Sequence, residues 1–398
     1  MDPADETEQP PPPCALDKFH ISPEYGFLLP DPQVGPPPSL PGMGSPRGPR
    51  QGLTAPQLSA AQLHGHRDLR LAHLVLGFIT AGYVWQDGEE GPAKVLPQNL
   101  AVPFWEVSRR LGLPPILLHA DLVLANWRDL STCANLDPIV WLPGGESLRG
   151  FVLVTMLVEK AAVPGLQVPL GMPRVRGIGR GLSAWSGPGR CCTPALPQAP
   201  PEPACARGTE QPVLDPLPCA ALQWATLPSW WRDNPAMPAG LLYEGVWELP
   251  QAYSGGSAAQ STVLHAFDAF LGVRHHEESS AFLHRMRDYM PPRHRAFVEA
   301  IQALPPLREL VLSSGNEALH CAYNRCVTAL AAFRTRHIAV ATKYVVTATA
   351  AKRSRGSPGT SPLQAAPSRP EQRGTGGSPV LRFLKSVRDA TREALLNV

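Results

Sequence analysis

The sequence is poor in charge and has no long apolar run. Charged residues make up 17% of its 398 positions, and the formal net charge is only +3. Such a balance offers little attraction for nucleic acid or for an anionic membrane surface. The apolar stretches at 151–158 and 340–351 are shorter than the roughly 20 residues that cross a bilayer. We therefore expect no nucleic-acid partner and no membrane span, and we favour a small molecule as the partner.

Signals for export and for structural metal binding are also missing. Residues 1–13 are acidic and proline-rich, without the basic and apolar regions of a secretory leader. The eight cysteines lack metal-finger spacing, and no Asn-x-Ser/Thr glycosylation site occurs. Both features agree with reduced thiols. The sequence predicts a cytoplasmic globular protein that is long enough to enclose a cofactor.

Proline is abundant and unevenly distributed. The 47 prolines concentrate in stretches that lack apolar periodicity, at 32–56, 165–220 and 353–379. Such composition favours loop or disorder over packed structure. The expected organisation is a disordered N-terminus at 1–15, a small helical domain at 16–130 containing 32–56, a large helical domain at 138–350 interrupted by 165–220, a flexible loop at 353–379 and a C-terminal helix at 380–398.

Between these stretches, apolar residues recur at helical spacing. Residues 70–86 carry a stripe typical of an amphipathic helix packed on a core. Residues 262–271 show the same spacing after Gly255-Gly256-Ser257, where a helix can begin. Residues 151–159 are apolar nearly all round, which predicts full burial, although their β-branched residues leave a strand open. With hardly any strand signal, we predict an all-α fold with helices around an interior site.

The longest predicted helix spans 317–351, and Ser314 and Glu317 have the spacing of a capping box at its start. Its apolar stripe consists of Tyr323, Cys326, Leu330, Phe333, His337, Val340 and Tyr344. This spacing places the imidazole of His337 in the middle of the buried face.

His337 allows two interpretations. It is either a core histidine hydrogen-bonded to a neighbouring carbonyl, or an axial ligand that presents one ring nitrogen to haem iron. Arg334, Arg336 and Lys343 lie close by along the helix, where cations could pair with haem propionates. Solvated positions on a helix edge explain these three cations equally well.

Three other motifs carry weaker signals. His275-His276 with Glu277-Glu278 has the composition of a metal site, but adjacent residues point apart, so a solvated loop is favoured. Cys191-Cys192 has no histidine at useful spacing and is interpreted as incidental. Gly374-Thr375-Gly376-Gly377 is a hinge or a loop that closes over a ligand, and the hinge is favoured from the residues alone.

Several longer strings resemble one known family. They include RLAHLVLGFITAGYVWQ, LGLPPILLHADLVLANW, GGESLRGFVLVTMLVEK, YSGGSAAQSTVLHAFDAFLG and LSSGNEALHCAYNRCVTALAAFRTRHIAVATKY, in that order. Together with shorter strings they cover about 265 of 398 positions. All resemble indoleamine 2,3-dioxygenase, and His119 and Thr155 follow the pattern of the family's second paralogue.

The resemblance implies an all-α fold, with a small N-terminal domain over a large helical domain and haem b, with its iron, between them. It implies a reaction that adds O2 across the indole C2–C3 bond of L-tryptophan and gives N-formylkynurenine, the first step of the kynurenine pathway. The implied partners are L-tryptophan and related indoles, O2 and an electron donor for ferric haem, with no nucleic acid and no membrane.

The same resemblance assigns individual residues. His337 matches the proximal haem and metal ligand, Arg334 the residue that pairs with a propionate, and Asp268 a carboxylate on the proximal side. The distal pocket is matched by Phe151 and Thr155 and, deeper in, by His119 and Leu122. Gly256, Ser257 and Ala258 match the loop at the haem edge, and Thr375 matches the mobile loop over the substrate.

Two segments depart from the family pattern, at about 33–64 and 165–225. The second replaces a stretch that carries a phenylalanine stacked on substrate and an arginine that holds its carboxylate, and Arg232 is one cation near that place. Losing both contacts should cost on the order of 2 to 5 kcal/mol of substrate binding. A haem-binding or interaction protein with impaired catalysis is therefore the alternative, and an incompletely folded variant is a second one.

Overall fold

The computed structural model describes residues 16–29, 60, 63–88, 91–129, 136–140, 145–167, 231–232, 234–342 and 380–397. Within these residues the chain is helical, which confirms the predicted all-α class. The helices are α1 (His66–Trp85), α2 (Gln98–Leu111), α3 (Gly145–Ala161), α4 (Val163–Leu166), α7 (Thr262–Leu271), α8 (Glu277–Met286), α9 (Pro292–Gln302), α10 (Leu307–Ser313), α11 (Glu317–Ala341) and α13 (Val380–Glu393).

Short elements join the helices. The helical turns are η1 (Asp17–Phe19), the π-helical η3 (Ala120–Ala125), η6 (Ala258–Gln260) and η7 (Arg287–Tyr289). Strand β1 (Val95–Leu96) pairs in parallel with β4 (Leu242–Tyr243), and β2 (Arg128–Asp129) pairs antiparallel with β3 (Leu136–Asp137). These two-residue pairs fasten loops and build no larger sheet among the described residues.

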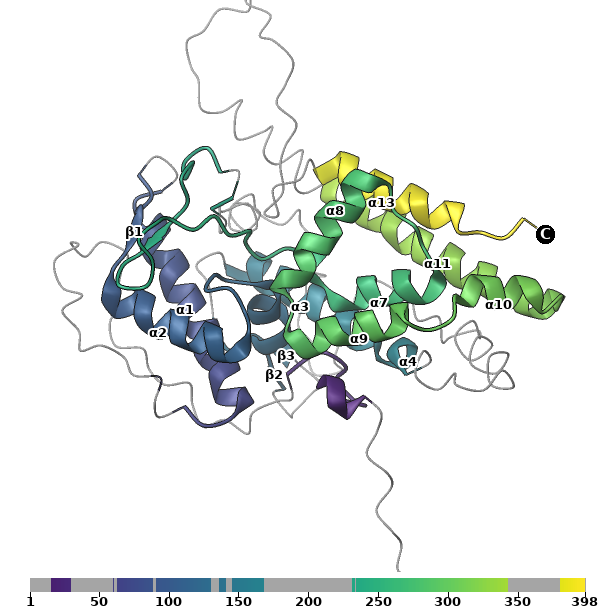
Figure 1. Ribbon diagram of the computed structural model, residues 1–398, viewed down its shortest axis with the longest axis horizontal. Helices are drawn as coiled ribbons and strands as arrows, with labels where there is room; N and C mark the ends of the chain where they lie inside the picture. The colour runs from purple at the N-terminus through teal and green to yellow at the C-terminus, as the bar shows by residue number, and fades with distance from the viewer. Residues whose placement is uncertain are drawn as a thin grey trace, which may run out of the picture.

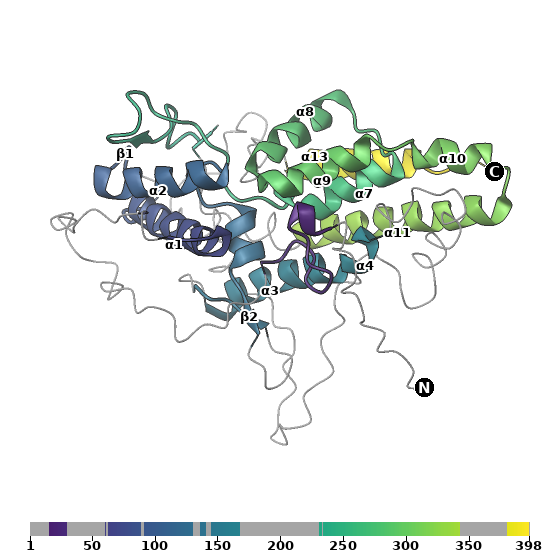
Figure 2. The same ribbon diagram turned by 60° about the horizontal axis from the view of Figure 1, so that its bottom comes forward.

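Helices from the two ends of the chain lie at opposite ends of the molecule. Figure 1 shows α1 and α2 together at one end, and α10, α11 and α13 at the other. Figure 2 shows α3 and α4 below the layer of α7, α8 and α9. The turn η3 packs against both α1 and α3, so it links the first group of helices to the central one.

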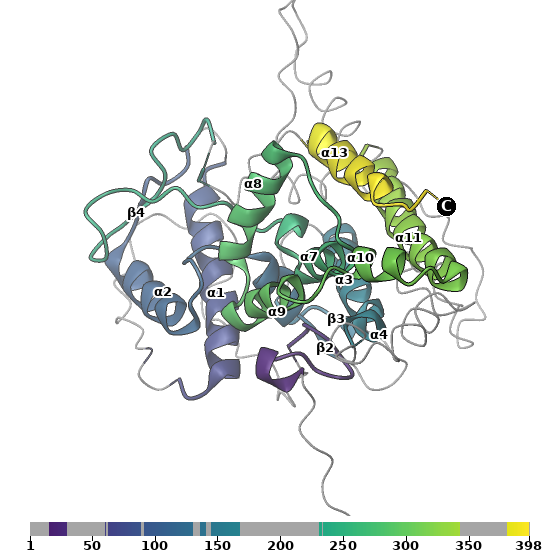
Figure 3. The same ribbon diagram turned by 45° about the vertical axis from the view of Figure 1, so that its right-hand side comes forward.

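The last helix runs antiparallel to α11, as Figure 3 shows. Asn324, near the start of α11, exchanges hydrogen bonds with the backbone of Leu396, while Arg334, further along, donates to Thr391. Tyr323 adds a hydroxyl bond to the carbonyl of Ala394 at 3.2 Å. The end of the chain is therefore fastened along most of α11.

The predicted helix at 317–351 is observed as Glu317–Ala341, and residues from 343 onward lie outside the described part. Its predicted capping box is wrong. Asn316 is the N-cap, and its side chain accepts from the amides of Ala318 and Leu319 at 3.0 and 3.2 Å. Ser314 instead donates back to Val311 in the preceding helix at 2.6 Å, because it closes the last turn of α10.

The apolar stretch at 151–159 forms part of α3, so the strand alternative is excluded. Its predicted full burial is wrong. Val152 and Met156 are buried in the core, but Val154 is 40% exposed and Leu157 36% exposed. The helix therefore packs with one face and leaves part of its apolar surface uncovered.

Two other helices agree with prediction. α7 has the predicted bounds, and α1 begins at His66, four residues before the predicted start. Among the described residues, no helix combines the length and apolar character needed to cross a bilayer. The stretches 1–15, 32–56 and 353–379, predicted as loop or disorder, lie outside the described residues, as does 168–220. The predicted loop from 165 starts too early, because α4 continues to Leu166.

Candidate functional site

His337 lies on the second half of α11, and its ring nitrogens have no hydrogen-bond partner in the part of the chain that the structure describes. The ring is half-buried and stacks on Phe333, with ring centroids 6.4 Å apart and planes at 29°. It makes no hydrogen bond to any residue that the structure describes, so the interpretation as a core histidine bonded to a carbonyl is not supported. Burial and the neighbouring Arg334 guanidinium lower the pKa of the imidazole. A neutral ring with a free nitrogen is the form that ligates a metal.

The residues of the predicted apolar stripe of α11 become more exposed to solvent toward the C-terminal end of the helix, beyond His337. Tyr323, Cys326 and Leu330 are 0 to 5% exposed, whereas Val340 is 42% exposed. Tyr344 lies outside the described residues. The surroundings of His337 are therefore apolar and only partly covered by the described chain.

Arg334 and Asp268, which were predicted as separate site residues, are in direct contact. One carboxylate oxygen of Asp268, Oδ2, accepts two hydrogen bonds, from the Arg334 guanidinium at 2.7 Å and from the Nε2 of His275 at 2.8 Å. Burial alone would raise the pKa of Asp268, but Arg334 and His275 outweigh it and hold that pKa far below its usual range. Arg334 also donates to the hydroxyl of Thr391 on α13. One buried ionic cluster thus joins α7, α11 and α13.

The interpretation of 275–278 as solvated, rather than as a metal site, holds for three of the four residues: His276, Glu277 and Glu278 are exposed, and only His275 departs from it. Glu277 and Glu278 open α8, with their charges in its first turn, and His276 is the N-cap residue. His275 turns inward to Asp268 because that buried carboxylate needs a second donor. Sequence reasoning missed this role. Asp268 and His275 are seven residues apart, on either side of the end of α7, and no helical or strand periodicity relates two such positions.

Of the other cations, Arg336 is exposed on α11, which agrees with a solvated position, and Lys343 lies outside the described residues. The described residues also do not include Cys191-Cys192 or the glycine-rich segment 374–377 with Thr375.

On the predicted distal side, the 255–261 loop packs against the start of η3. A Cβ added to Gly256 would lie 2.9 Å from a Leu122 methyl carbon, 3.2 Å from the Leu118 carbonyl carbon and 3.3 Å from the His119 nitrogen. Only glycine fits this approach without displacement. The Ser257 hydroxyl accepts from the Ala259 amide at 3.2 Å and begins the short turn η6, which Ala258 opens.

Thr155 is half-buried on α3, and the side chain of Phe151 lies outside the described part. One turn after Thr155, Glu159 is buried and contacts both His119 and the 255–261 loop. Sequence reasoning missed Glu159. The signal available was a carboxylate directly after the mostly apolar stretch 151–158 of the same helix.

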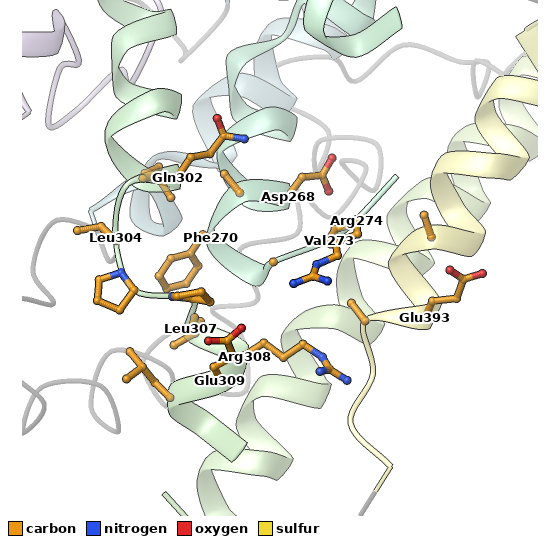
Figure 4. Close-up of a pocket in the computed structure, with 18 residues that line it drawn as sticks. Asp268, Phe270, Val273, Arg274, Gln302, Leu304, Leu307, Arg308, Glu309 and Glu393 are labelled. Atoms are coloured by element: carbon orange, nitrogen blue, oxygen red, sulfur yellow. The ribbon is translucent and has the colours of Figure 1, made fainter. Parts of the chain in front are cut away.

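A cavity of about 710 Å³ opens at the C-terminal end of α7. It is enclosed by the α9–α10 loop, α10 and the last turn of α13, with Phe270 and Leu307 on its walls and Arg274, Arg308 and Glu393 around it (Figure 4). Asp268 contributes to its lining, but His337, Thr155 and Ser257 do not. Asp268 is therefore the one described residue of the predicted haem site that this cavity shares.

Among the described residues, no group of three or more His, Cys, Asp or Glu side chains could hold a metal ion. A metal ion bound near His337 would therefore have at most two such side chains of the described chain as ligands. Porphyrin iron meets this condition, because the macrocycle supplies the other ligands.

The comparison with known proteins decides the family. The model of the family described as "Indoleamine 2,3-dioxygenase" matches residues 50–174 and 227–394. The chain belongs to the indoleamine 2,3-dioxygenase family. It is 49% identical to human Indoleamine 2,3-dioxygenase 2, over 97% of this chain and 96% of that protein. It is 40% identical to rat Indoleamine 2,3-dioxygenase 1, over 96% of each.

A third relative bears a different name. The chain is 33% identical to the myoglobin of Haliotis madaka, over 95% of this chain and 98% of that protein. The indoleamine 2,3-dioxygenase model leaves out 175–226, which falls almost wholly within the predicted non-family segment at 165–225. It begins at residue 50, so part of the other such segment, 33–64, lies inside the match.

Proposed function

We propose that this chain is a haem-dependent dioxygenase that opens the indole ring of L-tryptophan to give N-formylkynurenine. The observation that carries the proposal is His337, a partly buried imidazole without a hydrogen-bond partner among the described residues, on a helix of a chain that belongs to the indoleamine 2,3-dioxygenase family. We further propose that the protein acts in the cytoplasm, on L-tryptophan and related indoles, with O2 and an electron donor for ferric haem.

The residues around His337 suit haem b. The lowered pKa keeps the imidazole neutral, and the flanking Phe333 and Val340 offer apolar contact to a porphyrin face. Arg334 uses donors toward Asp268 and Thr391, yet a guanidinium has five N–H groups and can serve a propionate as well. When bound, haem would supply the iron that binds and activates O2.

The protein's own residues have a different task in this proposal. Phe151, Thr155, Ser257 and Ala258 form the walls that orient the indole ring. Gly256 lets the 255–261 loop approach η3 closely, which narrows the space open to water. Thr375 lies outside the described residues, and we propose for it, from the family resemblance, a role in covering the bound substrate.

A second candidate is a haem protein that does not turn over tryptophan. Two observations favour it: the similarity to a protein named myoglobin, and the gap that the family model leaves at 175–226, where the arginine for the substrate carboxylate is expected. Arg232 is exposed, and its backbone amide donates to the carbonyl of Tyr253 at 3.0 Å. We propose that its guanidinium is a weaker substitute for the missing cation.

One experiment separates these functions. The full chain is titrated with haemin, checked for a cooperative thermal melt by circular dichroism, then reduced and supplied with L-tryptophan and O2. A Soret band together with N-formylkynurenine supports the dioxygenase. A Soret band without product supports the second candidate. A chain that melts cooperatively but shows no Soret band with haemin rejects both candidate functions. A chain without a cooperative melt is the incompletely folded variant.

A further inference from the structure

Glu159 is a buried carboxylate that the proposed chemistry does not use. It lies near the end of α3, one turn after Thr155, and is 2% exposed. Its Oε1 accepts from the Ser261 hydroxyl at 2.6 Å and from the Nε2 of His119 at 3.0 Å. Its Oε2 is buried and has no hydrogen-bond partner among the described residues.

These bonds join three elements that meet on the predicted distal side. Glu159 belongs to α3, His119 is the residue before η3, and Ser261 ends the loop that carries Gly256, Ser257 and Ala258. They are far apart in sequence, by 40 residues for His119 to Glu159 and 102 for Glu159 to Ser261. The carboxylate is therefore the point at which α3, η3 and the loop are held together.

Gln260 completes the connection. Its side-chain oxygen accepts from the His119 amide at 3.0 Å, and its side-chain nitrogen donates to the Gly255 carbonyl at 2.7 Å. The loop is thus fixed at its start through Gly255 and at its end through Ser261. Both bonds are buried, so water competes for them poorly.

Stability alone does not explain a carboxylate at this position. Removing a charge from water is costly, and replacing such groups with apolar side chains of similar volume is often neutral or stabilising. Here one oxygen makes both bonds while the other makes none, an arrangement that is poor for stability. A buried polar group of this kind calls for another explanation.

We propose that Glu159 is a positioning residue for the indole ligand. Through His119 and Ser261 it fixes the 255–261 loop against α3 beside Thr155, and this placement sets the affinity of the pocket for tryptophan. The inference rests on the proposed function for the identity of the ligand. The hydrogen bonds that place the loop are made between protein groups, so they can be tested without haem.

The first test measures loop placement in the chain as purified. Glu159→Leu keeps the side-chain volume but removes both hydrogen bonds, whereas Glu159→Gln keeps an oxygen that can accept both. The control is Val311→Ala, which truncates a buried side chain on α10. We expect hydrogen–deuterium exchange at 255–261 and 118–125 to rise at least tenfold in Glu159→Leu and to stay within about twofold of wild type in the other two variants.

The second test uses the haem-loaded protein with carbon monoxide as a probe of the distal side. We expect Glu159→Leu to take up haem as wild type does. Its dissociation constant for L-tryptophan should rise at least tenfold, and tryptophan should no longer shift the C–O stretching frequency. Glu159→Gln should restore both readouts, and Val311→Ala should change neither.

The outcomes separate the two proposals. Unchanged exchange at 255–261 in Glu159→Leu overturns the inference, whether or not haem binds. Raised exchange together with wild-type tryptophan affinity also overturns it. A wild-type chain that binds no haem rejects the proposed function and the link to tryptophan, while the exchange data still decide whether Glu159 holds the loop.

Discussion

Asp268 accepts a hydrogen bond from Arg334 at 2.7 Å, and this buried pair joins α7 to the second half of α11. Since α11 carries His337, the pair fixes the helix that presents the proposed haem ligand. His275 and Thr391 extend the same cluster to the start of α8 and to α13. The orientation of the imidazole therefore depends on contacts from three other parts of the chain.

Removing the charge of Asp268 should destabilise the fold. In Asp268→Asn the guanidinium of Arg334 stays buried without its counter-charge, and breaking such a pair costs about 3 kcal/mol. Because the folded-state pKa of Asp268 is lowered, its contribution is present above the unfolded pKa and is lost as pH falls through the folded one. Urea unfolding at pH 7 therefore measures the full effect.

The matched control is Asp288→Asn, which removes the carboxylate of an exposed pair with Arg295 at 3.1 Å. Surface pairs contribute about 0 to 1 kcal/mol. If both variants lose the same small amount of stability, the buried cluster does not hold the helices as described.

Acid should weaken the fold through His265. Its Nε2–H donates to the Ala259 carbonyl at 2.8 Å, and burial, with Arg287 adding to it, lowers its pKa to about 4 from 6.5. The unfolded state then binds the proton more readily, so stability falls as pH drops from about 6.5 toward 4. We expect this histidine to contribute about 2 kcal/mol of the loss between pH 7.5 and pH 5.

The comparison is with His265→Gln, whose amide can keep the bond to Ala259 but does not titrate. His66, with a pKa of about 4, remains in both proteins, so the difference isolates His265. Parallel stability curves for the two proteins over this pH range would show that His265 has no such role.

Gly256 tests how tightly the 255–261 loop packs. The Cβ in Gly256→Ala would meet the backbone of Leu118 and His119 at 3.2 to 3.3 Å, so we expect a loss of about 1 to 2 kcal/mol in unfolding free energy. Gly82→Ala is the control, because Gly82 is an exposed position of α1 with nothing within 4 Å of the added carbon. That change should stabilise by up to about 1 kcal/mol. Equal effects of the two substitutions would disprove the close approach.

Local sequence pattern was enough to predict the helical class and the helices α1, α7 and the start of α11, but His337, predicted in the middle of a buried face, is only half-buried. The bounds of α7 follow from its apolar spacing, and the stripe of α11 predicts which face His337 occupies. The hydrogen bonds of the site could not be predicted in this way. Arg334 and Asp268 are 66 residues apart, and Glu159 and Ser261 are 102 apart. Such pairs depend on how the helices pack, which one sequence does not encode in any local pattern.

The solvated positions predicted for 275–278 hold at His276, Glu277 and Glu278, and the prediction failed at His275 for a related reason. Adjacent histidines and glutamates have the composition of a polar surface loop, and only the buried Asp268 turns one of the four inward. The full burial predicted for α3 failed because apolar composition does not show which face meets a neighbour, as Val154 and Leu157 demonstrate.

The most direct test of the central claim compares haem binding by wild type, His337→Ala and His320→Ala. His320 lies on the same helix, and its Nε2 bonds to the Val311 carbonyl at 3.0 Å, so its loss controls for removing an imidazole from α11. We expect His337→Ala to weaken haem affinity about 10- to 100-fold or more, while His320→Ala binds haem as wild type does. Equal haem content in all three proteins would contradict the assignment of His337 as the ligand.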